Sequence, residues 1–295
     1  MIKDYKNKNI AKMKGIKMSI LKINETPVRT SRNFNINNVK LEDIQIPENL
    51  KEFKGTTIVQ NNSNIKLSSN IEKYDITYGL GDFFTNQVLE KANKNINIEI
   101  DGSDEKNINI DNILSSDNLN LIDNVKILAN ENSKATIVIK YKSDKNIEFF
   151  HNGIIKIIAK NNSNINVIIV NLLSETSNNF LSIDAELEES SKIKATIIDF
   201  GGKNSITNYY SNLIGDLSDN KLESIYLGKD NQLVDINYIA ALRGKKSNID
   251  INVQGALKDQ AKKHFKGTID FKKGCKKATG NENEECMLLS NKAKS

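Results

Sequence analysis

The chain has 295 residues, enough for one large domain or two small ones. Its formal charge is +5, with 42 Lys and Arg against 37 Asp and Glu mixed along the sequence; this mixture favours a solvated surface over a nucleic-acid-binding patch. No apolar run approaches the roughly 18 residues that span a bilayer, and no signal peptide is recognised. We therefore expect neither a nucleic-acid nor a membrane partner.

The chemistry of the two cysteines points to a reducing compartment. Cys275 and Cys286 are the only thiols, which excludes a disulfide framework, and no C-x-x-C motif is present. Proteins with so few cysteines are typical of the cytoplasm, which is the location we expect.

The N-terminal part predicts two segments. Residues 1–20 are rich in lysine and predict a basic tail or a frayed helix. Residues 21–94 predict a mixed segment that begins with extended or irregular chain over Leu21–Leu50. Asp82–Lys91 predicts its one helix, with Asp82 as the N-cap. Two short strands are expected near Thr56–Val59 and Ile65–Leu67, and the apolar helix face comprises Phe84, Val88, Leu89 and Ala92.

Residues 95–295 show a different pattern, in which short runs rich in Ile, Leu and Val alternate with polar hinges. Successive hinges fall roughly 11–18 residues apart, a degenerate repeat typical of stacked β structure. The apolar runs are Ile96–Ile100, Val125–Leu128, Ala135–Ile139, Ile154–Ile158, Val167–Val170, Leu181–Ala185, Ile193–Ile198, Ser224–Leu227, Val234–Ala240, Ile249–Val253, Gly267–Phe271 and Met287–Leu289.

Two all-β architectures fit this pattern. A β-sandwich needs tight hairpin turns, of which only Asp101-Gly102 and Asn152-Gly153 are found. Hinges rich in Asn, Ser and Lys, such as Asn161–Asn164, suit the corners of a solenoid, where like residues stack. The scarcity of large aromatic residues fits an interior of slim β-branched side chains. The pattern favours a β-helix, with the sandwich as the alternative.

No complete catalytic or metal-binding constellation is evident. Fe–S chemistry needs soft thiolate ligands, but Cys275 and Cys286 are more readily explained as small residues in or beside the core. His264 lies in what reads as a basic surface turn, and His151 has no carboxylate-and-histidine set nearby. Gly244-Lys-Lys-Ser lacks the first glycine of a phosphate-binding loop. We therefore assign no catalytic, cofactor-binding or metal residues and predict that the chain is not an enzyme.

Four ordered blocks of the C-terminal half resemble the SufB/SufD family of Fe–S cluster assembly scaffolds. They are Ile198–Gly202, Glu223–Gly228, Val253–Asp259 leading into Lys262–Phe271, and Gly280–Glu284 with Leu288–Ser290. The resemblance implies a right-handed parallel β-helix over 95–295, preceded by a short α-helical N-terminal region. The family's C-terminal helical domain has no counterpart in this sequence.

The resemblance also implies a function. In the SufB branch a functional cysteine precedes a Gly-Asp pair, and Ser211 stands at the matching position here, which indicates the SufD branch. The implied function is a non-catalytic scaffold subunit that pairs with a SufB-like subunit, or forms a homodimer, and binds a SufC-type ATPase. An Fe–S cluster would be held only transiently in that complex. The alternative is a β-solenoid polysaccharide-binding or lyase-type protein, which would need converging carboxylates on one face.

Overall fold

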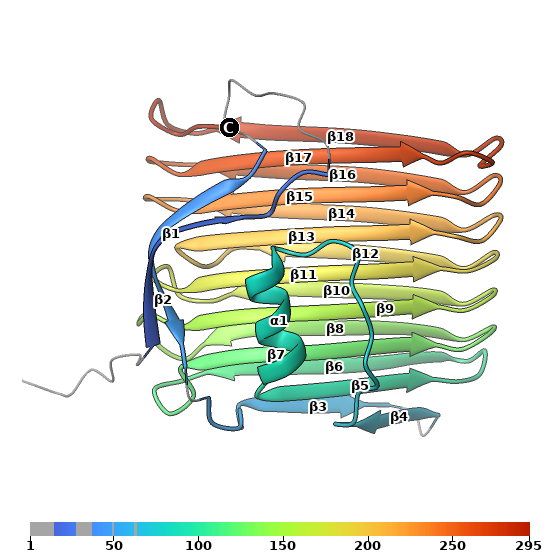
Figure 1. Ribbon diagram of the computed structural model, residues 1–295, viewed down its shortest axis with the longest axis horizontal. Helices are drawn as coiled ribbons and strands as arrows, with labels where there is room; N and C mark the ends of the chain where they lie inside the picture. Colours follow the sequence, from blue (N-terminus) through green and yellow to red (C-terminus); the bar gives the residue numbers. More distant parts are fainter. Residues whose placement is uncertain (1–14, 28–36, 49, 62–63) are drawn as a thin grey trace, which may run out of the picture.

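The body of the protein is a parallel β-helix, which confirms the predicted architecture. The computed structural model describes residues 15–27, 37–48, 50–61 and 64–295. Successive strands alternate between two broad sheets, and about seven coils stack along one axis (Figure 1). The strands of the body are β5 (Lys94–Ile100), β6 (Glu105–Leu114), β7 (Asn120–Ala129), β8 (Lys134–Ser143), β9 (Phe150–Ala159), β10 (Asn164–Leu172), β11 (Asn178–Leu187), β12 (Lys192–Asp199), β13 (Asn204–Leu213), β14 (Asp219–Gly228), β15 (Leu233–Leu242), β16 (Asn248–Leu257), β17 (Lys262–Phe271) and β18 (Thr279–Leu288).

Each sheet has eight strands. The covered sheet, named for the N-terminal segment that lies on it, has the order β17-β15-β13-β11-β9-β7-β5-β4. The bare sheet has the order β18-β16-β14-β12-β10-β8-β6-β3. At the first coil, β3 (Thr56–Gln60) and β4 (Ile65–Ser68) pair antiparallel with β6 and β5, while the later pairs within both sheets are parallel.

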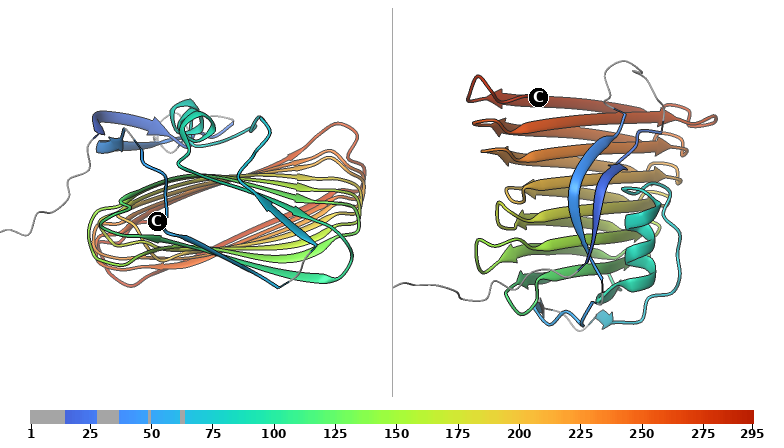
Figure 2. Two further views of the ribbon diagram at one scale, coloured as in Figure 1. Left: turned by 90° about the horizontal axis from the view of Figure 1, so that it is seen from below. Right: turned by 60° about the vertical axis from the view of Figure 1, so that its left-hand side comes forward.

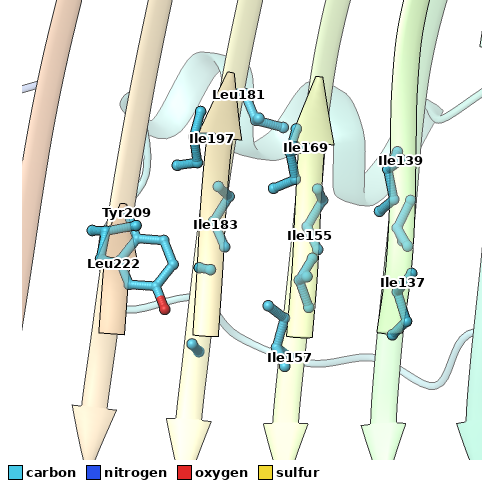
Figure 3. Packing of buried hydrophobic residues seen from close by; sticks show 14 of the residues in the cluster. Ile137, Ile139, Ile155, Ile157, Ile169, Leu181, Ile183, Ile197, Tyr209 and Leu222 are labelled. Carbon is cyan, nitrogen blue, oxygen red and sulfur yellow. The ribbon is translucent and has the colours of Figure 1, made fainter. Parts of the chain in front are cut away.

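The coil interior is formed by alternate residues of every strand, as a period of two requires. Ile137 and Ile139 from the bare sheet face Ile155 and Ile183 from the covered sheet (Figure 3). The expectation of a purely slim interior is wrong. Large aromatic residues also fill it, namely Tyr141, Phe149, Tyr209, Tyr226 and Tyr238, each at most 1% exposed.

The corners of the coils repeat one backbone conformation. A non-glycine residue with φ between 55° and 60° occupies the same place in successive coils, at Asn132, Asn162, Ser190, Leu217, Lys246 and Lys277. In most coils the next residue is a buried serine, whose hydroxyl donates to a carbonyl three residues earlier, as Ser163 does to Lys160 at 2.7 Å and Ser191 to Glu188 at 2.8 Å. This hydrogen bond stabilises the tight corner, so the predicted hinges are the corners of the solenoid.

The N-terminal segment lies across the outer face of the covered sheet (Figure 2). Its hairpin, β1 (Gly15–Ile23) and β2 (Val39–Pro47), is antiparallel, and α1 (Asp82–Lys91) packs on β7 and β9. A second apolar cluster joins Phe84 and Val88 of α1 to Phe150 and Phe180 of the sheet. The covered sheet is therefore buried on both faces. No helix among the described residues is long and apolar enough to cross a membrane.

The N-terminal segment also corrects several local predictions. Gly15–Ile23 is a strand and not the frayed helix or tail expected for residues 1–20, of which residues 1–14 lie outside the described residues. The range Leu21–Leu50, expected to be extended or irregular chain, contains the strand β2. The helix has the predicted bounds, but its N-cap is Gly81, with no side-chain cap hydrogen bond, and Asp82 is the first helical residue.

Candidate functional site

Side chains of β14, β17 and β18 form a cluster of polar and titratable groups near the C-terminal end of the solenoid, which we call the terminal cluster: Tyr226, Lys263, Glu282, Glu284 and Cys286. Nζ of Lys263 lies 2.5 Å from Oε1 of Glu284, and the Lys263 side chain is only 3% exposed. The hydroxyl of Tyr226 donates to the same carboxylate at 3.3 Å. Burial raises the pKa of Glu282, and it raises that of Tyr226 with a further contribution from Cys286.

Local backbone geometry explains how these groups meet. The covered sheet supplies Lys263 from β17, while the bare sheet supplies Tyr226 from β14 and the two carboxylates and the thiol from β18. Glycines leave room: a Cβ at Gly255 would lie 2.4 Å from the Tyr226 ring, and one at Gly267 would lie 2.1 Å from Glu282. The Glu284 carboxylate compensates the Lys263 ammonium, so the core of this cluster is an ion pair and not an open set of ligands. The sequence offered no signal for this cluster, because its members are scattered over 61 positions between Tyr226 and Cys286.

The two cysteines do not form one site. Cys286 lies on β18 opposite Gly255 in the strand register, and Cys275 lies in the turn between β17 and β18. Both are free, half-buried and packed against the interior core. Within the described ranges no group of three or more His, Cys, Asp or Glu side chains is arranged to hold a metal ion.

The histidines differ from their expected surroundings. His264 lies on strand β17 and not in a turn; its side chain is 42% exposed, and its Nδ1 lies 3.3 Å from Oδ2 of Asp235. His151 is fully buried inside the coil, and its Nε2 lies 2.8 Å from Oδ1 of Asp123. No carboxylate-and-histidine set lies near His151 in the sequence, but coiling brings Asp123 to it from the preceding coil, 28 residues earlier.

Ser211 lies on the interior face of β13, between Ala185 and Ala240 of the neighbouring coils. It is fully buried, and its hydroxyl has no hydrogen-bond partner. Another polar cluster lies on the outer side of the covered sheet. There Lys266 and the buried Asn24 both bind Oδ1 of Asp235, at 2.7 and 2.5 Å, which ties the N-terminal segment to β15 and β17.

Comparison with known protein families identifies the family to which this chain belongs. Residues 112–295 match the model described as SUF system FeS cluster assembly, SufBD core domain. The chain belongs to the SufB/SufD family. A search of curated proteins finds no match.

Membership of the SufB/SufD family gives the protein a role in Fe–S cluster assembly by the SUF system, as the resemblance implied. The match begins in β6 and covers the coils that contain Ser211, His151 and the terminal cluster. It favours the assembly hypothesis over a polysaccharide-binding solenoid. The Fe–S cluster is the product of that system, and hence cargo for any scaffold in it.

Proposed function

We propose that this protein is a non-catalytic scaffold subunit of the SUF machinery, of the SufD type, which pairs with a SufB-like subunit and binds a SufC-type ATPase. The match of residues 112–295 to the SufBD core carries this proposal. The serine at position 211, where the SufB branch has a functional cysteine, supports the SufD type. Two free cysteines support a cytoplasmic location.

The interior chemistry supports a scaffold role. Several titratable groups inside the coil bind other interior side chains: Asp123 binds His151, Glu284 binds Lys263, and Asp199 accepts from Ser205. An active site would instead direct such groups to a substrate in an open cleft. A rigid solenoid whose interior charges are paired within the coil is better suited to holding partners in place.

Co-purification tests the partnership. The protein, co-expressed with SufB-like and SufC-type proteins, should elute with both from a sizing column at micromolar concentration. An unrelated β-solenoid of similar charge serves as the control bait and should elute alone. Separate elution of the chain from both partners would contradict the proposal.

Anaerobic reconstitution tests whether the isolated chain carries a cluster. We expect far less than one cluster per chain, measured as protein-bound iron and sulfide, because the two thiols lie apart and a cluster usually needs several thiolates. The Cys275→Ser and Cys286→Ser variants should behave like the wild type. One cluster per chain that is lost in either variant would contradict the non-catalytic, cluster-free subunit proposed here.

A further inference from the structure

A line of hydrogen-bonded side chains runs through the coil interior, and we call it the interior polar ladder: Asp123, His151, Asn179, Ser205 and Asp199. His151, Asn179 and Ser205 are register partners on β9, β11 and β13. Each of the five residues is at most 4% exposed. Gly153 makes room for the first contact, since a Cβ there would lie 2.4 Å from Oδ1 of Asp123 and 2.8 Å from Nε2 of His151.

The contacts of the ladder are short and continuous. Nε2 of His151 lies 2.8 Å from Oδ1 of Asp123, and its Nδ1 lies 2.6 Å from Oδ1 of Asn179. Nδ2 of Asn179 donates to Oγ of Ser205 at 2.9 Å. Oγ of Ser205 donates in turn to Oδ2 of Asp199 at 2.6 Å. Four hydrogen bonds therefore connect two buried carboxylates through one imidazole.

The direction of these bonds fixes the number of protons. If Ser205 donates to an ionised Asp199, it must accept from Nδ2 of Asn179, which turns the amide oxygen toward His151. Nδ1 of His151 then has to donate, and with Asp123 also ionised Nε2 donates to that carboxylate. The imidazole must carry both ring protons in this arrangement. A neutral imidazole with both carboxylates ionised would leave two acceptors facing each other somewhere along the ladder, which is costly in a buried site.

We propose that the interior polar ladder binds one proton, shared between His151 and Asp199. In the first form His151 is an imidazolium and Asp199 is ionised. In the second form the proton is on Asp199, which donates to Ser205; Ser205 donates to the rotated amide of Asn179, whose NH2 group donates to Nδ1 of a neutral His151. Both forms contain the same number of protons, so the proton moves along the ladder without exchange with solvent.

The surroundings favour retention of this proton. The titratable groups that contact the imidazole are Asp123 of β7 and Tyr141 of β8, whose ring centroid lies 4.1 Å from that of His151. Burial raises the pKa of Tyr141, so its hydroxyl remains a donor to Oδ2 of Asp123, at 2.9 Å. Lys156 of β9 faces away, toward Asp184, and α1 on that side contributes the uncharged Gln87 to Asn152. Without the shared proton, Asp123 and Asp199 would be two buried anions with no interior cation between them.

Nuclear magnetic resonance on the whole chain tests the proposal, because the sequence contains only two histidines. The ring 15N signals report the midpoint pH at which His151 loses its second proton. Ser205→Ala removes the hydroxyl that holds the Asn179 amide oxygen toward His151, and Asp199→Asn removes the negative charge of Asp199. Each variant should therefore lower this midpoint by about one pH unit, a tenfold loss of proton affinity. Ser211→Ala is the matched control, since it deletes an unpaired interior hydroxyl from the same strand, and it should leave the midpoint unchanged.

The double variant separates a shared proton from independent effects. Ser205→Ala and Asp199→Asn relieve the same conflict, so together they should lower the midpoint by no more than the larger single effect. Additive effects, or a wild-type midpoint in Ser205→Ala, would overturn the proposal. If either variant does not fold, the wild type decides: the Asp199 carboxyl carbon and the His151 nitrogens should titrate with one common midpoint, and two separate midpoints would overturn the proposal.

Discussion

Lys156 and Asp184 form a buried salt bridge across two neighbouring coils, with Nζ 2.6 Å from Oδ1. Their side chains are only 10% and 2% exposed. The second oxygen of Asp184 accepts the backbone N–H of Thr77 at 2.8 Å. One carboxylate therefore compensates a buried ammonium group and also anchors the N-terminal segment.

Removal of this carboxylate should be strongly destabilising. Asp184→Asn leaves the Lys156 charge buried without a partner, and we expect the free energy of unfolding to fall by about 3 kcal/mol or more. Urea denaturation followed by circular dichroism measures the change. Glu72→Gln is the control: it breaks the Lys126–Glu72 pair, where Glu72 is 89% exposed, and should cost less than about 1 kcal/mol. Equal losses in the two variants would contradict this account.

The close approach of corner backbones gives a second prediction. A Cβ at Gly244 would lie 1.8 Å from the carbonyl oxygen of Gly215 in the preceding coil, and backbone cannot move aside as a side chain can. Gly244→Ala should cost about 2–3 kcal/mol. Gly228→Ala, whose Cβ would meet the flexible end of Leu257 at 2.8 Å, should cost clearly less. Thermal denaturation of both variants measures the difference, and a harmless Gly244→Ala would show that the corners are not closely packed.

Leu217 offers a stabilising substitution. Its φ of 60° lies in the left-handed region, which is strained for leucine, and its side chain is 50% exposed. Burial of the side chain therefore does little to compensate the strain of the backbone. Asparagine tolerates this conformation and occupies the equivalent corner at Asn162. Leu217→Asn should therefore raise the free energy of unfolding by about 1 kcal/mol, and Asn162→Leu should lower it by a similar amount. A lower melting temperature for Leu217→Asn would argue that the Leu217 side chain stabilises the corner.

The buried carboxyl of Asp199 should make stability depend on pH. Burial raises its pKa from 3.8 to about 6, against the opposing hydrogen bonds from Ser205 and Asn171. The native state therefore holds this proton more tightly than the unfolded chain. This contribution is complete below pH 3.8 and is lost as the pH rises through about 6, a decrease of about 3 kcal/mol. Asp199→Asn should flatten the stability profile between pH 4 and 7, whereas the exposed Asp144→Asn should not.

The repeating part of the fold could be predicted from the sequence, while the polar interior could not. The alternation of apolar and polar residues is clear where one face of the strand is exposed to solvent, as in β8 and β10. The polar hinges mark the corners of the coils directly. Two strands of the coiled body, β6 and β13, contain no apolar run that predicts them, for physical reasons. Strand β6 contains several asparagines, which disfavour strands. Strand β13 is buried on both faces, with Ile206 and Tyr209 on opposite sides, so it lacks the alternation of apolar and polar residues that marks a half-exposed strand.

The candidate sites were hidden because their members meet only after coiling. Asp123, His151 and Asn179 are each separated by 28 residues, which is one coil but was not visible as a period in so degenerate a repeat. Lys263 and Glu284 likewise come from opposite sheets of the last coil. The sequence does direct attention to Cys286 and His151, but not to the residues that they contact. Ser211 is indicated by the family resemblance and not by the pattern of the residues around it.

The N-terminal segment alters how a repeat protein of this kind should come apart. Stacked repeats that touch only their neighbours lose terminal units one at a time. Here Tyr74 of the N-terminal segment binds Asn124 on β7. Asn24 of the same segment binds Asp235 on β15, and its carbonyl oxygen accepts from the ammonium of Lys266 on β17. The N-terminal segment therefore connects early and late coils. Loss of coils from either end of the solenoid would break contacts with this N-terminal segment, so the solenoid should unfold in one cooperative step.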